Sequence, residues 1–485
     1  MINWRSLLHV LSFIVIIMAL FLTAPILVGI YYREWTCVRD FAVVLGFVLA
    51  GFLLLFFLTR KARGFQFNTK DGFLLVSLSW IVVSAVGAVP FVLTGAVPNY
   101  TEAFFETMSG FTTTGASILT IIEGLPYSVL FWRSLTHWLG GMGIVVLAVA
   151  VLPLLGIGGM PLIQAESPGP QVDKIVPRVR ETAKILWVIY IGLSVLEIFL
   201  LFFGGMNFFD SMTHTFGTMA TGGFSPKNAS VGHYTSPYLQ NIITLFMILA
   251  GINFGLYYVL LQWNWKTVWR NTEIKVYISI FAISSLVIAF DLRGENIFGT
   301  LKESLRYGGF QAASILTTTG FAPADFDAWP FLSRAVLFFL MFVGGCSGST
   351  GGGIKVVRVL TLFKLAINEM KHLLNPRGVY LIRLNGSLVK KDMVYTITGF
   401  VFLYIFMLLL ITLAVALSGV DLLSSFSAAL VTLGNIGPGF GRVGPALNYH
   451  FMAPWVKWIL SFAMMVGRLE VYTVLVILTP HYWKK

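Results

Sequence analysis

The chain has 485 residues, of which 57% are hydrophobic and only 11% are charged. A soluble protein of this length carries about a quarter charged residues, so a soluble globular fold is excluded. The net charge of +12 does not indicate nucleic acid, because the basic residues cluster in alternate loops near 60–70, 174–184, 266–275 and 355–391. This placement is typical of cytoplasmic loops in a membrane protein. Apolar runs of about twenty residues recur along the chain and predict an all-α polytopic membrane protein.

Two apolar segments, at 7–31 and 41–59, begin the chain. The first is longer than the apolar part of a signal peptide, which has about 7–15 residues, so we expect it to be retained as a span. Neither segment contains a polar break. We therefore predict that residues 1–70 form two peripheral transmembrane helices.

Four similar units follow, each with a span, a short re-entrant pore helix, a polar break and a second span. With the first two helices they predict ten crossings, which place both termini on the basic, cytoplasmic side. The predicted units are residues 71–157, 158–265, 266–391 and 392–485. The predicted first spans are 72–96, 183–204, 275–291 and 393–417; the pore helices are 99–111, 207–219, 297–316 and 420–433; the second spans are 127–155, 237–263, 329–364 and 451–478.

The polar breaks are the most informative feature of these units. They read FTTTGAS at 111–117, MATGGFS at 219–225, LTTTGF at 316–321 and LGNIGP at 433–438. Backbone freed from a helix at membrane depth is tolerated only where it is buried in protein or lines a water-filled path. A single break would be read as an ordinary turn between two helices. Four breaks at matching places favour one pore, in which main-chain carbonyls replace the water around a monovalent cation.

A glycine in each break supports this interpretation, because glycine adopts left-handed dihedrals at little cost and lets successive carbonyls point the same way. The pore helices begin with acidic or capping residues and direct the negative ends of their dipoles at the break. These first residues are Thr101 and Glu102, Asn207 and Asp210, and Asp421. The residues predicted to supply oxygens to the filter are Thr113, Thr114 and Gly115; Ala220, Thr221 and Gly222; Thr318, Thr319 and Gly320; Asn435, Ile436 and Gly437.

At these four breaks the sequence resembles the Trk/Ktr/HKT superfamily of potassium transport proteins, and within it the membrane subunit of a bacterial Trk uptake system. The resemblance covers nearly the whole chain and implies gated potassium uptake across the bacterial inner membrane, with the potassium ion as permeant ligand and no tightly bound cofactor. Potassium is favoured because related plant proteins that carry sodium often have Ser where this chain has Gly115. The resemblance also implies a homodimer with one pore per subunit, and a cytosolic nucleotide-binding ring protein, TrkA, docking on the basic segment 358–391.

The second span of the third unit is interrupted at 344–355 by GGCSGSTGGGIK. Each glycine costs about 1 kcal/mol relative to alanine inside a helix, so this segment is predicted to unwind below the filter. It is not a phosphate-binding loop, because Lys355 is not followed by Ser or Thr. Close helix packing through glycine remains the alternative. The resemblance implies a gate made of an intramembrane loop; the assigned residues are Gly345, Cys346, Ser347, Gly348, Ser349, Thr350, Gly351, Gly352, Gly353 and Lys355.

Arg468 lies in the last apolar span, where a charge is costly and normally faces a cavity or a partner. A structural pair with Glu470 or with a main-chain carbonyl is the alternative. Residues two apart on a helix do not face each other, which weakens the pair with Glu470. The resemblance implies a basic residue that projects beneath the filter. We therefore assign Arg468 to the gate with the glycine loop.

Other charged and aromatic residues give weaker signals. Arg133, His137 and Trp138 are read as an anchor at the membrane interface. A symporter that couples potassium to protons or sodium would need an ionisable group in a span, for which Glu197 and Glu470 are the candidates. No cluster of nucleophilic or acidic residues supports an enzyme, and the two cysteines form no metal motif.

Overall fold

The computed structural model describes residues 2–60, 68–143 and 179–484, and nearly all of its regular structure is helical. Two short strands, β1 (Arg383–Leu384) and β2 (Ser387–Leu388), form one hairpin. The helices are α1 (Trp4–Leu20), α2 (Thr23–Tyr31), α3 (Trp35–Thr59), α4 (Thr69–Leu93), α5 (Tyr100–Phe111), α6 (Tyr127–Gly141), α9 (Val179–Phe203), α10 (Phe208–Met219), α11 (Pro237–Ala250), α12 (Phe254–Leu261), α13 (Trp265–Arg270), α14 (Thr272–Gly294), α15 (Leu301–Leu316), α16 (Phe331–Leu340), α17 (Val356–Leu374), α18 (Lys391–Ala416), α19 (Leu422–Leu433), α20 (Pro454–Arg468), α21 (Tyr472–Leu478) and α22 (Pro480–Trp483).

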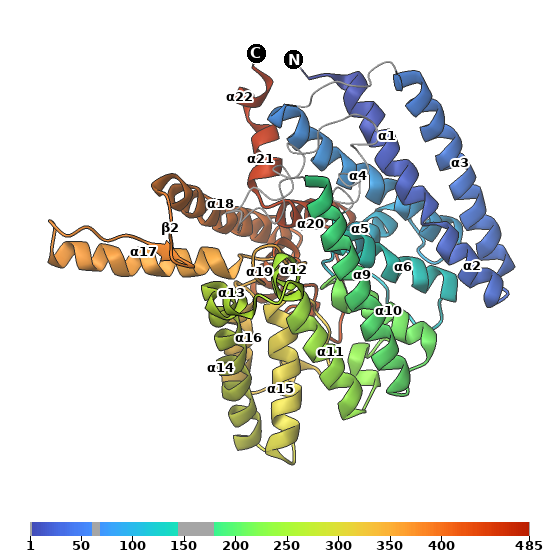
Figure 1. The fold of residues 1–485 in the computed structure, drawn as a ribbon. Coiled ribbons are helices and arrows are strands. Elements are labelled where there is room, and N and C mark those ends of the chain that lie inside the picture. The colour runs from blue at the N-terminus through green and yellow to red at the C-terminus, as the bar shows by residue number, and fades with distance from the viewer. Residues whose placement is uncertain (1, 61–67, 144–178, 485) are drawn as a thin grey trace.

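The N-terminal helices lie at one edge of the molecule, as the sequence predicts (Figure 1). Helices α1 and α2 together make one apolar span of 28 residues, and α3 makes a second of 25 residues. Both begin a few residues before the predicted starts at 7 and 41. The side chains of α3 are largely exposed, Phe47 by 78% for example. This exposure fits a helix that contacts lipid on most of its sides.

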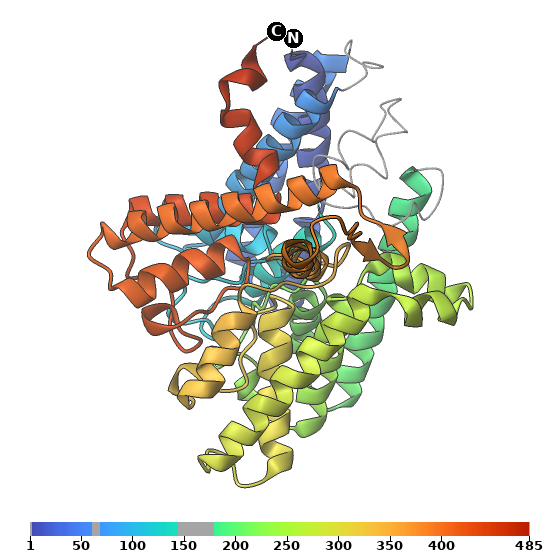
Figure 2. The same ribbon diagram turned by 90° about the vertical axis from the view of Figure 1, so that its left-hand side faces the viewer.

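The four predicted units follow one another around the centre of the molecule. In Figure 2 the second unit lies at the right, the third at the bottom and most of the fourth at the left, with the cyan helices of the first unit behind them. The two ends of the chain lie close together in both views (Figures 1 and 2), which fits an even number of crossings. The pore helices α5, α10, α15 and α19 are buried over most of their length, whereas the first spans α9, α14 and α18 expose apolar side chains.

Each pore helix has a side-chain cap; three begin within about two residues of the predicted starts, and α15 begins at Leu301, after the predicted 297. The cap accepts a hydrogen bond from the backbone N–H three residues later, which satisfies one of the free donors of the first turn. The caps are Asn99, Asn207, Thr300 and Asp421, with donor–acceptor distances of 3.0, 2.7, 3.2 and 2.9 Å. In the first unit the cap is therefore Asn99 and not the predicted Thr101.

Two of the predicted second spans, 237–263 and 451–478, are each divided into two helices. Helices α11 and α12 meet at 94°, and α20 and α21 meet at 118°. Both bends lie against the end of a pore helix. A Cβ on Gly467, in α20, would lie 2.0 Å from the carbonyl oxygen of Leu433, and a Cβ on Gly251, after α11, would lie 2.9 Å from the Thr317 side chain. Glycine thus lets both second spans approach the pore helices closely where they bend.

The described residues account for six to eight of the ten predicted crossings. Among the described residues six helices are long and apolar enough to span a membrane, or eight if each bent pair is one span. The two further predicted crossings are 329–364, which the glycine loop divides into α16 and α17, and 127–155. Helix α6 covers the first half of the latter, and its predicted continuation to 155 lies outside the described residues.

Candidate functional site

Each pore helix ends in the same hydrogen-bonded turn. The second residue after each pore helix has a positive φ and donates its N–H to the carbonyl three residues back, at 3.0–3.3 Å. The next residue donates to the carbonyl five residues back, at 2.8–2.9 Å. This is the pattern of a Schellman cap, which usually has glycine at the left-handed position. Here the left-handed residues are Thr113 (φ 54°), Thr221 (53°), Thr318 (59°) and Asn435 (54°).

A side chain in this conformation costs about 1–3 kcal/mol, so the surrounding structure must impose it. Four such positions at equivalent places are therefore a repeated feature and not isolated irregularities. Strained backbone of this kind is concentrated at functional sites. The four helix ends are accordingly the first candidate for the site.

A glycine with positive φ follows each of these residues two positions later. The glycines are Gly115 (φ 81°), Gly223 (78°), Gly320 (82°) and Gly437 (92°). A Cβ on each would collide with the main chain of the next unit: 2.1 Å from Gly222 O, 2.1 Å from Thr319 O, 2.1 Å from Ile436 O and 2.6 Å from Thr114 O, respectively. The first unit thus contacts the second, the second contacts the third, the third contacts the fourth, and the fourth contacts the first. The four breaks therefore form a closed ring in which only glycine fits.

In the second unit the ring uses residues one position later than the sequence analysis assigned. Gly223, not Gly222, has the left-handed φ, and the N–H of Gly222 donates to Gly217 O at 2.8 Å as Thr114 does to Ser109 O at 2.9 Å. The equivalent set is therefore Thr221, Gly222 and Gly223 in place of Ala220, Thr221 and Gly222. Because Gly222 and Gly223 are adjacent, the sequence alone could not show which of them lies on the ring.

Gly222 is small for a different reason, since its Cβ would lie 2.6 Å from the ring of His137. In the other three units the predicted sets lie on the ring as assigned. They are Thr113, Thr114 and Gly115; Thr318, Thr319 and Gly320; Asn435, Ile436 and Gly437.

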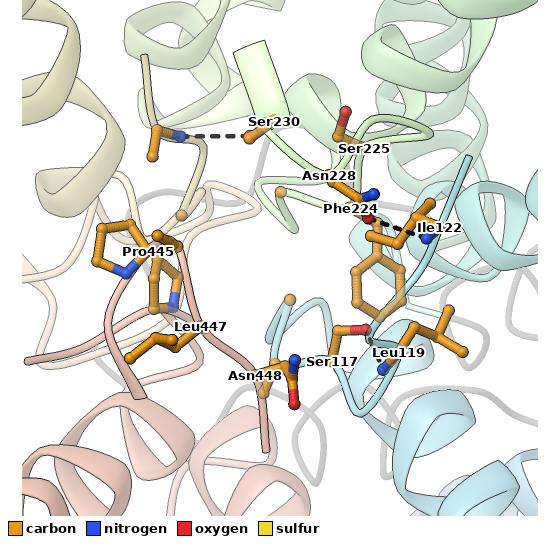
Figure 3. A pocket seen from close by; sticks show the side chains of 18 of the residues that line it. Ser117, Leu119, Ile122, Phe224, Ser225, Asn228, Ser230, Pro445, Leu447 and Asn448 are labelled. Carbon is orange, nitrogen blue, oxygen red and sulfur yellow. Dashed lines mark hydrogen bonds between the residues drawn. The ribbon is translucent and has the colours of Figure 1, made fainter. Parts of the chain in front are cut away.

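A cavity of about 130 Å³ opens at the level of the four glycines, all of which line it. Figure 3 shows its walls, which come from the segments that follow the breaks: Ser117 and Ile122 from the first unit, Phe224 and Ser230 from the second, Pro445 and Leu447 from the fourth. The remaining wall at the third and fourth breaks is formed by Gly320, Ala322, Gly437 and Pro438. We call this cavity the vestibule. It gives direct access to the ring from one side.

The glycine-rich segment lies against the ring at the level of the left-handed residues, two positions before the glycines. Its helix has unwound as predicted, because α16 ends at Leu340 and α17 begins at Val356. The N–H of Gly352 donates to Thr318 Oγ1 at 2.6 Å, and a Cβ on Gly352 would lie 2.5 Å from Gly434 O. The loop and the vestibule thus lie on opposite sides of the ring.

The second unit and α14 hold this loop in place. The N–H of Cys346 donates to Gly251 O at 2.8 Å, in the break between α11 and α12, and the N–H of Phe254 donates to Gly348 O at 2.9 Å. Glu273, near the start of α14, accepts the N–H of Ser347 at 2.7 Å. Lys355 donates to the carbonyl of Gly351 within the loop. The remaining assigned loop residues, Gly345, Ser349, Thr350 and Gly353, lie in the same unwound segment.

Arg468 joins the loop to two other units. It is the last residue of α20, and its guanidinium donates to Thr350 O at 2.7 Å, to Gly140 O at 2.8 Å and to Gly141 O at 2.9 Å. The fourth unit is thereby tied to the loop of the third unit and to the end of α6 in the first. Of the two structural alternatives, the local Arg468–Glu470 pair is wrong in this structure, because Glu470 forms its ion pair with Arg358 of α17. The pairing of Arg468 with main-chain carbonyls is the arrangement that the structure shows.

Of the predicted interface anchor of Arg133, His137 and Trp138, the first two are buried, so the interpretation is wrong for them; His137 is 0% exposed and its Nδ1 lies 2.7 Å from Gly110 O. Arg133 is only 2% exposed, and its Nε donates to Glu106 Oε1 at 2.6 Å while Nη1 donates to Ser225 O at 2.9 Å. Glu106 in turn accepts the N–H of Ile118 at 2.9 Å. This ion pair therefore supports the segments after the first and second breaks, and Arg133 itself lines the vestibule. A charged residue well inside a predicted span was the signal that could have found it.

Removing one partner of this buried pair should destabilise the protein strongly. We expect Arg133→Ala to lower the free energy of unfolding by about 3–5 kcal/mol, because Glu106 would remain charged and buried without its partner. The matched control is Arg39→Ala, whose pair with Asp40 is exposed (73% for the Arg39 side chain) and should contribute less than about 1 kcal/mol. Thermal unfolding of the purified protein in detergent measures both. Equal losses for the two variants would contradict the assigned role of Arg133.

The fold and the ring define a polytopic helical membrane protein in which four repeated units enclose one polar path, an architecture suited to moving ions. Comparison with known proteins gives the family. Residues 43–485 match the model of the TrkH family, described as cation transport protein. The chain belongs to the TrkH family.

Several relatives match over the full length. The chain is 40% identical over 487 residues to the Trk system potassium uptake protein TrkH of Escherichia coli K12, with all of both chains covered. It is 34% identical to the Trk system potassium uptake protein TrkI of Halomonas elongata, with all of this chain and 98% of that one covered. The crystal structure of the potassium transporter TrkH from Vibrio parahaemolyticus superposes with a TM-score of 0.90 at 36% identity, with all of both chains covered. The family resemblance seen at the four breaks is thus confirmed.

Proposed function

We propose that this chain conducts potassium passively through a gated pore that lies within one subunit. The closed ring of Gly115, Gly223, Gly320 and Gly437 carries the proposal. Main-chain oxygens of the three residues ending at each of these glycines would replace the hydration shell of the ion. Potassium as the ion comes from the relatives, which are named as potassium uptake proteins.

In this proposal the loop 344–355 and Arg468 close the path on the side opposite the vestibule. Gly352 supports the closure because it contacts two units at once: its N–H donates to Thr318 Oγ1 at 2.6 Å, and a Cβ on it would lie 2.5 Å from Gly434 O. Arg468 holds the loop through Thr350 O and adds a positive charge that repels cations. The gate would open when the loop leaves the ring.

The surroundings of the pore follow the same proposal. Both termini and the basic segment 358–391, with α17 and the β1–β2 hairpin, would face the cytoplasm of a bacterial cell whose inner membrane holds the protein. Helix α17 projects from the body of the molecule (Figure 1) and offers a surface for the TrkA-like regulator. The functional protein would be a homodimer, with one pore in each subunit.

The alternative is coupled symport of potassium with protons or sodium. Of its two candidate residues, Glu470 is paired with Arg358, whereas Glu197 is completely buried in α9. Single-channel recordings in a planar bilayer distinguish passive conduction from coupled symport. We expect unitary current steps carried by potassium. A symporter would show no such steps, and its potassium uptake would acidify the vesicle lumen or be lost when Glu197 is replaced.

The position of the ring in the second unit can be tested with adjacent glycines. Gly223→Ala should reduce the preference for potassium over sodium by about tenfold or more, because the new Cβ would displace Thr319 O in the ring. Gly222→Ala should act through the ring of His137 and should be relieved in a His137→Ala background. Competition between rubidium and sodium uptake in proteoliposomes measures both. If His137→Ala instead restored the ion preference of Gly223→Ala, the filter of the second unit would consist of Ala220, Thr221 and Gly222, as the sequence predicts.

A further inference from the structure

A second cavity, of about 640 Å³, lies beside the vestibule and is not part of the ion path. It is enclosed by α2, the segment between α5 and α6, the start of α6, the start of α10 and the segment after the second break. Its volume is in the range of pockets that hold a drug-sized ligand. We call it the side cavity.

One end of the side cavity faces the lipid. Leu27 and Phe208 line it and are 66% and 58% exposed, so in a membrane they contact acyl chains. Tyr31, Tyr32 and Tyr127 line it as well, and the rings of Tyr32 and Tyr127 stack at 4.0 Å. Tyrosine is enriched at the boundary between the bilayer and water. The opening therefore lies between lipid tails and headgroups.

The other end is polar and carries both signs of charge. Asp210 is 4% exposed and lies 3.6 Å from Lys227 Nζ, measured from its Oδ2. Glu123 is exposed, and its Oε1 accepts one long bond, 3.3 Å, from the N–H of Asn228. Two carboxylates and one ammonium group favour a ligand with a cation that can reach Glu123 and an anion that can reach Lys227.

We propose that the side cavity binds one phospholipid with a primary-amine headgroup. The ammonium group of the lipid lies at Glu123, its phosphate at Lys227 and an acyl chain along Leu27 and Phe208. A lipid whose headgroup carries only negative charge would bring no cation of its own to the two carboxylates of Glu123 and Asp210. The inference rests on the chain spanning a membrane and does not depend on the proposed conduction.

The lipid would contact the wall of the vestibule. Lys227 lines both cavities, and the N–H of Ile122 donates to Asn228 Oδ1 at 2.9 Å across the partition between them. The bond between Asn228 and Glu123 runs in the opposite direction across the same partition. A headgroup at Glu123 would therefore brace the segments that follow the first and second breaks.

Native mass spectrometry of the delipidated protein, titrated with phosphatidylethanolamine or phosphatidylglycerol, tests the proposal. We expect one tightly held phosphatidylethanolamine and at least about tenfold weaker retention in Glu123→Gln, because one charge-assisted hydrogen bond is lost. This variant keeps the acceptor for Asn228. Glu295→Gln, at the exposed end of α14, is the matched control and should bind as the parent does.

A second variant separates shape from charge. Val28→Trp should fill the side cavity and abolish the tight binding while Glu123 remains. Equal retention of the two lipids by the parent protein would overturn the proposal. So would unchanged retention of phosphatidylethanolamine by Glu123→Gln and Val28→Trp.

Discussion

Replacing Arg468 with alanine is expected to raise rubidium flux through proteoliposomes by about tenfold or more. Arg468 donates to carbonyls of Thr350, Gly140 and Gly141, and each hydrogen bond to a charged group contributes about 1.5–3 kcal/mol. Loss of even one such contribution from the closed state shifts the balance toward an open loop by roughly tenfold. Removal of the positive charge also lowers the electrostatic barrier for a cation.

Arg468→Lys separates these two effects. Lysine keeps the charge but lacks the planar fork that reaches the loop and α6 together, so it should restore only part of the closure. Flux that is unchanged or lower in folded Arg468→Ala protein would contradict the assignment of Arg468 to the gate. Full restoration by lysine would assign the effect to charge alone.

Gly115→Ser and Gly320→Ser are expected to lower the preference for potassium over sodium by about tenfold or more each. Both glycines have φ near 80°, and a Cβ at either would lie 2.1 Å from the carbonyl oxygen of the next unit, Gly222 O or Ile436 O. The carbonyl must move, which changes the oxygen cage that replaces hydration. Competition between rubidium and sodium uptake measures the preference.

Gly309→Ser is the matched control for these variants. Gly309 lies in the pore helix α15, and the nearest atoms to a Cβ there belong to the Ser285 side chain, at 3.8–3.9 Å. The added side chain therefore has room, and the ion preference should remain that of the parent. A preference that is unchanged in Gly115→Ser and in Gly320→Ser would show that these glycines do not shape the filter.

The sequence predicted the pore helices well because two strong local signals bound them. A capping residue such as Asn207 marks the start of α10, and the break at Thr221–Gly223 marks its end, so the predicted 207–219 agrees with Phe208–Met219. The unwinding at 344–355 was predictable for the same reason, since six glycines within twelve residues oppose a helix. Features fixed by composition and local turn chemistry were thus accessible.

The contacts between units were not accessible from the sequence. Arg468 finds its acceptors more than a hundred residues away, in the loop and in α6, and Arg133 finds Glu106 on another helix. The choice of Gly223 over Gly222 depends on which glycine faces the third unit. Each of these features is set by tertiary contact and not by local preference.

Anomalous diffraction from crystals soaked in rubidium tests the central claim most directly. The ring of Gly115, Gly223, Gly320 and Gly437 should hold rubidium on its axis, coordinated by main-chain oxygens from all four units. Rubidium sites that lie elsewhere in the protein, with the ring empty at a saturating concentration of the ion, would contradict the account.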